Sequence, residues 1–221
     1  MTKEKTPVRA KFQARYLPMI APFMAANDIR FYLNGFLIER AKKGVYIVGT
    51  NGHIMAVVHD AEGLLEGTDR LIVRRDAGLV SACKPKKIAI PNMVIVQDGR
   101  VSVAPDFGCE RTNIEKYVMP GSCFIEGKFP EWRKVLPNFA ELKPGLSSAC
   151  VNPEYIGIFE KVEKQSASRF GTVRFWQRPD PNAGIIVQLP SIPEFLGMVM
   201  PVHDTEHSQD HCRKLLDVFK K

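Results

Sequence analysis

Three times along the chain, a short helical stretch is followed by short apolar strands that end at turns. In the first unit, a strand expected at 8–12 precedes a helix expected at 16–26. The strands that follow are expected at 29–38, 45–48 and 54–58, with a glycine turn at Asn51-Gly52 before the last. Pro22 removes a backbone hydrogen bond inside the helix, so the helix should kink or end early. Short strands joined by such turns pair antiparallel, which predicts an α+β fold.

The second and third units repeat this order, although their sequences are hardly similar. A strand at 71–73 leads to a helix at 77–82, for which Asp76 is the expected N-cap. A later helix begins at Pro153 with Asn152 as its cap. Further strands are expected at 88–90, 93–96, 101–103, 173–176, 185–189 and 197–202. The last residues, 205–221, can form an additional helix with Leu215, Leu216 and Phe219 on one side. The chain is therefore a suspected structural repeat.

Composition points to a soluble protein with a polyanionic partner. The 221 residues carry 31 Lys and Arg against 24 Asp and Glu, a net charge of +7 that favours binding to phosphates. The five cysteines are scattered and form no CxxC pair, which argues against a disulfide framework or a zinc finger and fits a reducing compartment. No apolar run approaches the ~18 residues of a membrane span. No signal-peptide core follows Met1 either, so we expect a cytoplasmic protein that does not bind membranes.

Two short motifs are the most specific features of the sequence. They are Gly49-Thr50-Asn51-Gly52-His53 and Gly127-Lys128-Phe129-Pro130-Glu131-Trp132, and Val199-Met200-Pro201-Val202 accompanies them near the C-terminus. Neither motif contains a nucleophile–base pair, a metal-ligand spacing or a phosphate-binding loop, so we expect a binding protein without catalytic residues or cofactors. Each motif resembles a signature turn of the bacterial β sliding clamp, the processivity subunit of DNA polymerase III.

Other segments extend this resemblance, and they follow one another in the same order as in the family. Residues 29–39 and 71–75 are similar to strands of the clamp's middle domain, and 126–137 resemble its closing segment. Asn51 stands where the family usually has an acidic residue, and Ile54 replaces a family arginine. The first domain of the clamp and the first half of its last domain have no counterpart, so the resemblance is to a shortened and divergent clamp.

The resemblance implies the DNA-clamp fold, with helix-plus-antiparallel-strand modules, sheets outside and helices inside. Residues 7–139 would form a domain resembling the family's middle domain, and 148–203 a half-domain resembling the second half of its last domain. Residues 204–221 would be an extra tail. The loop-like composition of 140–148 marks the boundary between the two parts.

The resemblance also assigns two sets of site residues. In the family, partner proteins insert a peptide into an apolar pocket between the middle and last domains. The matching positions here are Leu33, Thr50, Gly52, His53, Met55, Pro137, Met198, Met200, Pro201 and Val202. Positions expected to face duplex DNA are Asn27, Arg30, Arg74, Arg75, Lys84, Lys161, Lys164 and Arg169. Ordinary core packing of the apolar residues and simple solvation of the charges are the competing interpretations.

Three functions remain open at this stage. The first is a processivity factor that encircles double-stranded DNA, docks DNA polymerase and repair proteins, and depends on a clamp loader to open it. Three modules cannot close around DNA, so this function requires a homo-oligomer, with roughly four copies matching the family's ring. The second is a non-encircling adaptor or inhibitor that binds the same peptides, as a phage or plasmid could encode. The third is a metal enzyme built on His203, His207 and His211, which recur every four residues.

Overall fold

A computed structural model of the chain describes residues 7–85, 92–106, 115–144, 150–166, 168, 171–180 and 182–202. The strands are β1 (Arg9–Gln13), β2 (Gly35–Arg40), β3 (Val45–Thr50), β4 (Ile54–Asp60), β5 (Leu64–Glu66), β6 (Arg70–Arg74), β7 (Asn92–Gln97), β8 (Arg100–Pro105), β9 (Tyr117–Val118), β10 (Lys143–Pro144), β11 (Arg174–Gln177), β12 (Ile185–Gln188) and β13 (Phe195–Val199). The helices are α1 (Tyr16–Ile20), α2 (Ala77–Ala82) and α3 (Pro153–Glu163), and short 3-10 helices lie at Ala21–Phe23, Phe31–Leu33, Trp132–Val135 and Phe139–Glu141.

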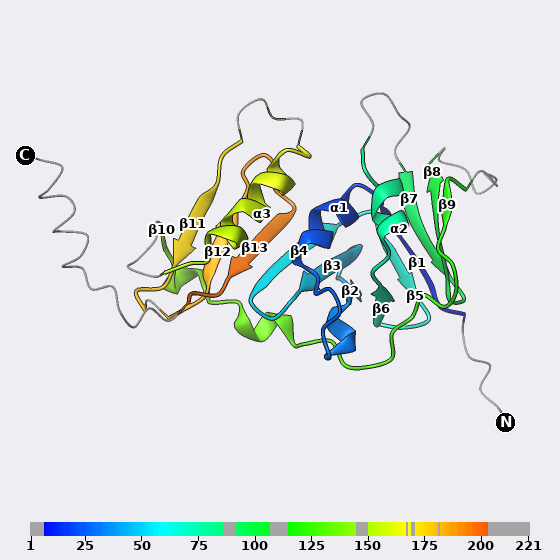
Figure 1. Cartoon of the computed structure of the whole chain (residues 1–221), viewed down its shortest axis with the longest axis horizontal. Coiled ribbons are helices and arrows are strands. Elements are labelled where there is room, and N and C mark those ends of the chain that lie inside the picture. The colour runs from blue at the N-terminus through cyan, green and yellow to red at the C-terminus, as the bar shows by residue number, and fades with distance from the viewer. Residues whose placement is uncertain are drawn as a thin grey trace, which may run out of the picture.

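The described strands form two antiparallel sheets (Figure 1). One has five strands in the order β5-β1-β7-β8-β9, and the other has eight in the order β10-β11-β12-β13-β4-β3-β2-β6. The larger sheet joins strands that are far apart in the sequence, because β13 pairs with β4 in a register that places Met198 opposite Met55. The first and third units are thus parts of one continuous sheet. That sheet also extends across the expected boundary at 140–148, since Lys143 in β10 pairs with Gln177 in β11.

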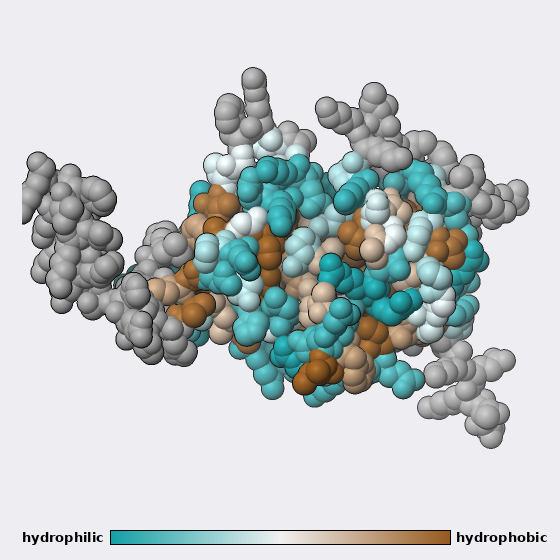
Figure 2. All heavy atoms as spheres, viewed as in Figure 1, coloured by the Kyte–Doolittle hydropathy of each residue, from teal (hydrophilic) through white to brown (hydrophobic). Residues whose placement is uncertain are grey.

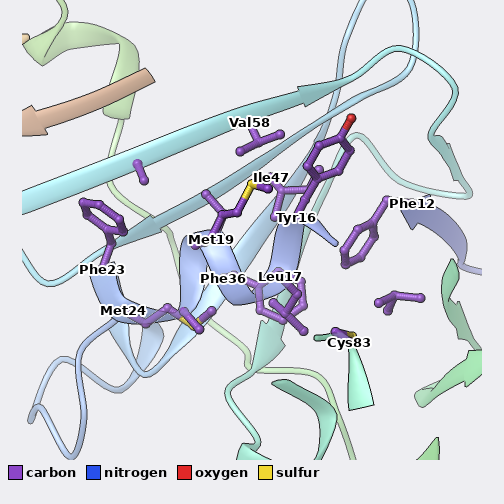
Figure 3. Close-up of a cluster of buried hydrophobic side chains, with 14 of the residues drawn as sticks. Phe12, Tyr16, Leu17, Met19, Phe23, Met24, Phe36, Ile47, Val58 and Cys83 are labelled. Carbon is purple, nitrogen blue, oxygen red and sulfur yellow. The ribbon is translucent and has the colours of Figure 1, made fainter. Parts of the chain in front are cut away.

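The helices lie together on one side of the sheets (Figure 1). All five residues of α1 are buried, and Figure 3 shows Leu17, Met19 and Phe23 directed into a cluster with side chains of the sheet. The Phe23 ring lies 5.3 Å from the Phe159 ring of α3 and 5.9 Å from Phe195 of β13, measured between ring centroids. Burying these apolar side chains supplies most of the driving force that fixes the helices on the sheet.

Two glycines allow the helices to approach the larger sheet closely. A Cβ atom added to Gly49 in β3 would lie 2.6 Å from Ile20 Cγ2 at the end of α1. One added to Gly197 in β13 would collide with the Phe159 ring of α3. The helix–sheet distance in both units therefore depends on the absence of a side chain.

The opposite face of the larger sheet is covered by an irregular segment, residues 125–142, which we call the outer crossover. A second apolar cluster forms beneath it. The buried members of this cluster are Leu37, Val48, Met55, Val57, Ile72, Phe129, Trp132, Ile186 and Met198. Since helices cover one face and the outer crossover covers the other, the central strands are buried on both sides, as their burial patterns show.

Many sequence-based expectations for local structure are confirmed. Asp76 Oδ1 accepts a hydrogen bond from the Leu79 N–H at 2.7 Å, and Asn152 Oδ1 accepts one from the Glu154 N–H at 2.9 Å. Both residues are thus N-caps. The first helix ends at Ile20 and continues only as a 3-10 turn, as Pro22 predicted. Among the described residues, the buried cysteines Cys83 and Cys123 are free, and burial raises the pKa of Cys83 to about 12.

The expected strand at 29–38 is wrong in its first half. A 3-10 turn occupies Phe31–Leu33, and β2 begins only at Gly35. The Asn34 side chain holds this turn, because it accepts from the Asp28 N–H and donates to the Asp28 carbonyl, both at 2.8 Å. Asn27 at φ 60° starts the loop in the left-handed region. Strand β5 was not expected from the sequence. The strand expected at 88–90 and the helix at 205–221 lie outside the described residues.

Candidate partner-binding pocket

A pocket of about 190 Å³ opens on the outer side of the larger sheet, where β4 and β13 meet. Its walls are mainly apolar and come from four separate segments of the chain. The lining residues are Arg30, Tyr32, Leu33, Thr50, Gly52, His53, Ile54, Met55, Pro130, Glu131, Trp132, Val135, Met198 and Met200. The structure therefore brings together seven of the ten residues that the sequence assigned to a partner site, namely Leu33, Thr50, Gly52, His53, Met55, Met198 and Met200.

The turn between β3 and β4 forms one wall, and its own side chains fix its shape. Thr50 Oγ1 accepts from the Gly52 N–H at 3.0 Å and donates to the Ile54 carbonyl at 2.7 Å. Asn51 Oδ1 accepts from the His53 and Ile54 N–H groups at 2.9 and 3.0 Å. Gly52 has φ 93°, which other residues rarely adopt. Asn51 supplies the acceptor oxygen that an acidic residue would supply at this position.

Arg30 lies over this turn, although the sequence placed it among the DNA-facing residues. Its guanidinium donates to the Asn51 carbonyl at 3.3 Å, and a Cβ added to Gly52 would lie 3.0 Å from an Arg30 nitrogen. Asp28 holds the guanidinium with two hydrogen bonds, at 3.0 and 2.8 Å. These bonds, together with the Arg30 N–H, lower the pKa of Asp28 to about 2. The pocket rim therefore carries a guanidinium that is held in place by its ion pair with Asp28.

The outer crossover forms the opposite wall, and a buried carboxylate holds it against the sheet. Glu39 in β2 is 7% exposed, and it accepts from Arg70 Nε at 2.7 Å and from Trp132 Nε1 at 3.3 Å. Arg133 also forms an ion pair with Glu39, and its guanidinium lies 4.0 Å from the centroid of the Trp132 ring. Arg70 binds Glu131 through both terminal nitrogens, at 2.9 and 3.3 Å. Glu39 is thus a positioning residue for the pocket wall.

The end of β13 completes the pocket. The Met200 N–H donates to the His53 carbonyl at 2.9 Å, so the two assigned motifs are hydrogen-bonded to each other. The His53 ring stacks on Tyr155 of α3 at 6.4 Å between ring centres. Met200 is 38% exposed, whereas Leu33 is only 1% exposed and also belongs to the core. A charged residue at Leu33 would therefore disturb the fold as well as the pocket.

The other three assigned partner-site residues lie outside this pocket. Pro137 lines a second groove of about 500 Å³ on the outer face, over β11, β12 and β13. Pro201 is half-buried, and Val202 is exposed and pairs with Cys150, whose carbonyl accepts from its N–H at 2.8 Å. Conversely, the sequence did not assign Tyr32, Val135 or the three residues Pro130–Trp132 to the pocket, although the last three form part of the 127–132 motif.

The residues expected to face DNA are distributed around the helices. Arg74, Arg75 and Lys84 flank α2, and Lys161 and Lys164 lie at the end of α3, all exposed. Arg74 donates to the Pro120 carbonyl at 2.9 Å, and Lys164 pairs with Glu160 at 2.5 Å. Asn27 is exposed on the loop that leads to the pocket. Arg169 lies outside the described residues. Figure 2 shows hydrophilic residues over much of the helix-bearing face, interrupted by apolar spots.

The described part of the chain contains no candidate metal site. No three His, Cys, Asp or Glu side chains among those residues are grouped to hold a metal ion. His203, His207 and His211 lie outside it. No helix among the described segments is long and apolar enough to cross a membrane.

Comparisons with known proteins place the chain beside the sliding clamps. No family model matches it. A β sliding clamp of Vibrio cholerae is 29% identical over 147 residues, covering 61% of this chain and 37% of that protein. The β sliding clamp of Escherichia coli K12 is 29% identical over 116 residues, covering 52% of this chain and 28% of that protein. The chain thus spans about a third of the length of these relatives.

Solved structures show the same fold over most of the chain. A DNA polymerase sliding clamp from Pseudomonas aeruginosa aligns with a TM-score of 0.61 at 19% identity, covering 92% of this chain and 68% of that one. The pol III beta of Caulobacter crescentus aligns with a TM-score of 0.59 at 15% identity and the same coverage. The fold is therefore that of the DNA sliding clamps, as the resemblance predicted. The chain is thus similar to the β sliding clamps in sequence over part of its length and in fold over most of it.

Proposed function

We propose that the chain is a clamp-like processivity factor for a DNA polymerase, which encircles duplex DNA as a homo-oligomer. It would dock peptides of replication and repair proteins in the pocket where β4 and β13 meet, which we call the junction pocket. The observation that carries this proposal is the pocket itself. Residues from the β3–β4 turn, the 3-10 turn before β2, the outer crossover and the end of β13 converge there, and seven of them are the positions that the family resemblance assigned.

The chemistry of the pocket suits a peptide rather than a small-molecule substrate. Its volume of about 190 Å³ is below the range of roughly 300–1,000 Å³ that is usual for small-molecule and cofactor sites. Met55, Met198 and Met200 supply adaptable apolar contacts, so several peptide sequences can fit. Arg30, held at the rim by Asp28, offers guanidinium N–H donors to a peptide carboxylate or carbonyl. Such a site binds apolar anchor side chains and discriminates weakly among partners.

The helix-bearing face is the face proposed to line the DNA. Arg74, Arg75 and Lys84 outnumber the single carboxylate of Asp76 and give the α2 region a net positive charge. Long basic side chains attract the DNA phosphates without reading the base sequence, so the protein can slide along the duplex. Three helix-and-strand units span only part of a ring, so several copies of the chain are needed to close it. Roughly four copies in total would match the number of units in the family's ring.

A primer-extension assay on a primed single-stranded circle tests the processivity claim. Longer products in a single binding event are expected when the protein and its loader are added to the polymerase. The Met200→Glu variant should lose this effect, because it places a charge on the exposed pocket wall while the fold remains intact. Product lengths that do not change when the wild-type protein is added would contradict the proposal.

The second candidate is a non-encircling adaptor that binds the same peptides. One observation favours it: the positive charge on α3 is partly offset, since Lys164 pairs with Glu160 and Glu154 lies on the same helix. An adaptor would bind clamp-binding peptides and compete with the polymerase, so it would shorten the products in the assay above.

A further inference from the structure

The described chain ends at the rim of the pocket. β13 leads directly into Met200, whose side chain lines the pocket and whose N–H is bonded to His53. Two residues later, Val202 pairs with Cys150 beside the start of α3. Residues 203–221 therefore follow a point next to the pocket that contains seven of the ten assigned partner-site residues. The second groove lies at the other end of β13, around Phe195 and Leu196.

The sequence after Val202 has two parts of contrasting chemistry. Residues 203–211 contain no apolar side chain. The following stretch, 212–221, concentrates four apolar residues between basic ones, and we call these four the tail cluster: Leu215, Leu216, Val218 and Phe219. A polar spacer followed by a compact apolar cluster is the composition expected of a tethered peptide ligand, because the spacer favours water and the cluster favours a pocket.

The pocket has an unfilled apolar surface that such a cluster fits. Ile54, Met55, Val135, Met198 and Met200 line a cavity large enough for one or two aliphatic or aromatic side chains. Leu and Phe side chains are less stable in water than when they are buried against apolar surface. Docking of the tail cluster would therefore remove apolar surface of both the pocket and the cluster from water.

The spacer is long enough for the tail cluster to reach the pocket of its own chain. The residues between Val202 and Leu215 span at most about 40 Å when extended. As a flexible coil they average roughly 20 Å. The pocket wall at Met200 is two residues from Val202, so this reach exceeds what is required. A ligand on such a tether has an effective concentration on the order of 1 mM.

We propose that the tail cluster docks in the junction pocket of the same chain and competes there with partner peptides. This inference rests on the proposed function, because it requires that the pocket accepts peptides. A partner must then displace the tail, so only ligands that bind more tightly than the tethered cluster, or that are locally concentrated on DNA, occupy the site. With an intrinsic dissociation constant of about 0.1 mM, a tether at about 1 mM would weaken partner binding roughly tenfold.

Fluorescence anisotropy with the full chain tests this competition. One labelled probe is a synthetic peptide that copies residues 209–221, and the other is a peptide with the clamp-binding motif of a DNA polymerase. The test variant is the double substitution Leu216→Asp and Phe219→Asp. Its matched control, Ser208→Asp and Gln209→Asp, adds the same two charges to the polar spacer. We expect both probes to bind the test variant about tenfold more tightly than the unchanged chain, and the control to behave like the unchanged chain.

The outcomes separate this inference from the proposed function. If the polymerase peptide binds all three proteins equally and the tail peptide binds none, the pocket still accepts peptides and the tail inference is overturned. If neither peptide binds any of them, the proposed function fails as well. If the substitutions in the tail cluster lower the native mass, the cluster docks in a second copy, which overturns docking within one chain.

Discussion

Replacing Glu39 with glutamine tests how the outer crossover is held. Glu39 is the shared acceptor for Arg70, Arg133 and Trp132, and glutamine keeps only one acceptor oxygen. The variant therefore leaves one guanidinium facing an amide NH₂ group. A hydrogen bond to a charged group contributes about 1.5–3 kcal/mol. Because the Arg70 and Arg133 side chains are 36% and 47% exposed, water compensates in part, and we expect a loss of about 1.5–2 kcal/mol.

A loss of that size is measurable by thermal unfolding. For a protein of this length, each kcal/mol shifts Tm by about 2–4 °C, so Glu39→Gln should lower Tm by roughly 3–8 °C. Peptide affinity should fall too, because Trp132 and Glu131 line the pocket and depend on this network. Glu126→Gln is the matched control, since Glu126 is exposed on the same segment and has no ion pair or hydrogen bond within the described residues. Equal Tm values for the two variants would refute the reasoning.

Three further predictions concern the core, the pocket and the helix-bearing face. Gly197→Ala should reduce stability by about 1–3 kcal/mol by overpacking. Gly157→Ala lies on an open helix surface and should raise stability by about 0.5–1 kcal/mol. If both alanine variants shifted the unfolding curve in the same direction, close packing at Gly197 would be contradicted. Met200→Glu should abolish peptide binding in a titration while Tm stays unchanged, because its side chain is 38% exposed. Arg75→Gln should make the slope of log K against log salt concentration for DNA binding shallower by about one, because one phosphate contact is lost. Lys164→Gln removes a charge that is already paired with Glu160, so it should leave this slope unchanged.

The parts of the fold that depend on local signals could be predicted from the sequence. Asp76 and Asn152 act as helix caps through hydrogen bonds two or three residues away, which sequence spacing can reveal. Pro22 shortened the first helix as expected because its effect is confined to the helix backbone. The stretch at 29–38 was predicted as one strand since its composition is β-rich, but Asn34 side-chain bonds to Asp28 favour a turn instead.

The candidate site was only partly predictable because it is assembled from distant segments. The pairing of β4 with β13 sets Met55 opposite Met198, and no local pattern specifies that register. Arg30 was assigned to the DNA face from its position in the resemblance, yet its bond to Asp28 holds it at the pocket rim. The role of Glu39 had one sequence signal, a lone acid in an apolar strand, but its partners Arg70 and Arg133 emerge only in three dimensions.

Retention on circular DNA tests the central claim most directly. The native mass would be measured at low and moderate salt, and the protein would then be loaded onto nicked circular DNA and followed after a restriction enzyme linearises it. The account predicts an oligomer that stays on the circle at moderate salt and slides off the linear product, because encirclement depends on topology rather than on phosphate contacts. A monomer or dimer that leaves circular and linear DNA at the same rate would contradict encirclement and favour the adaptor.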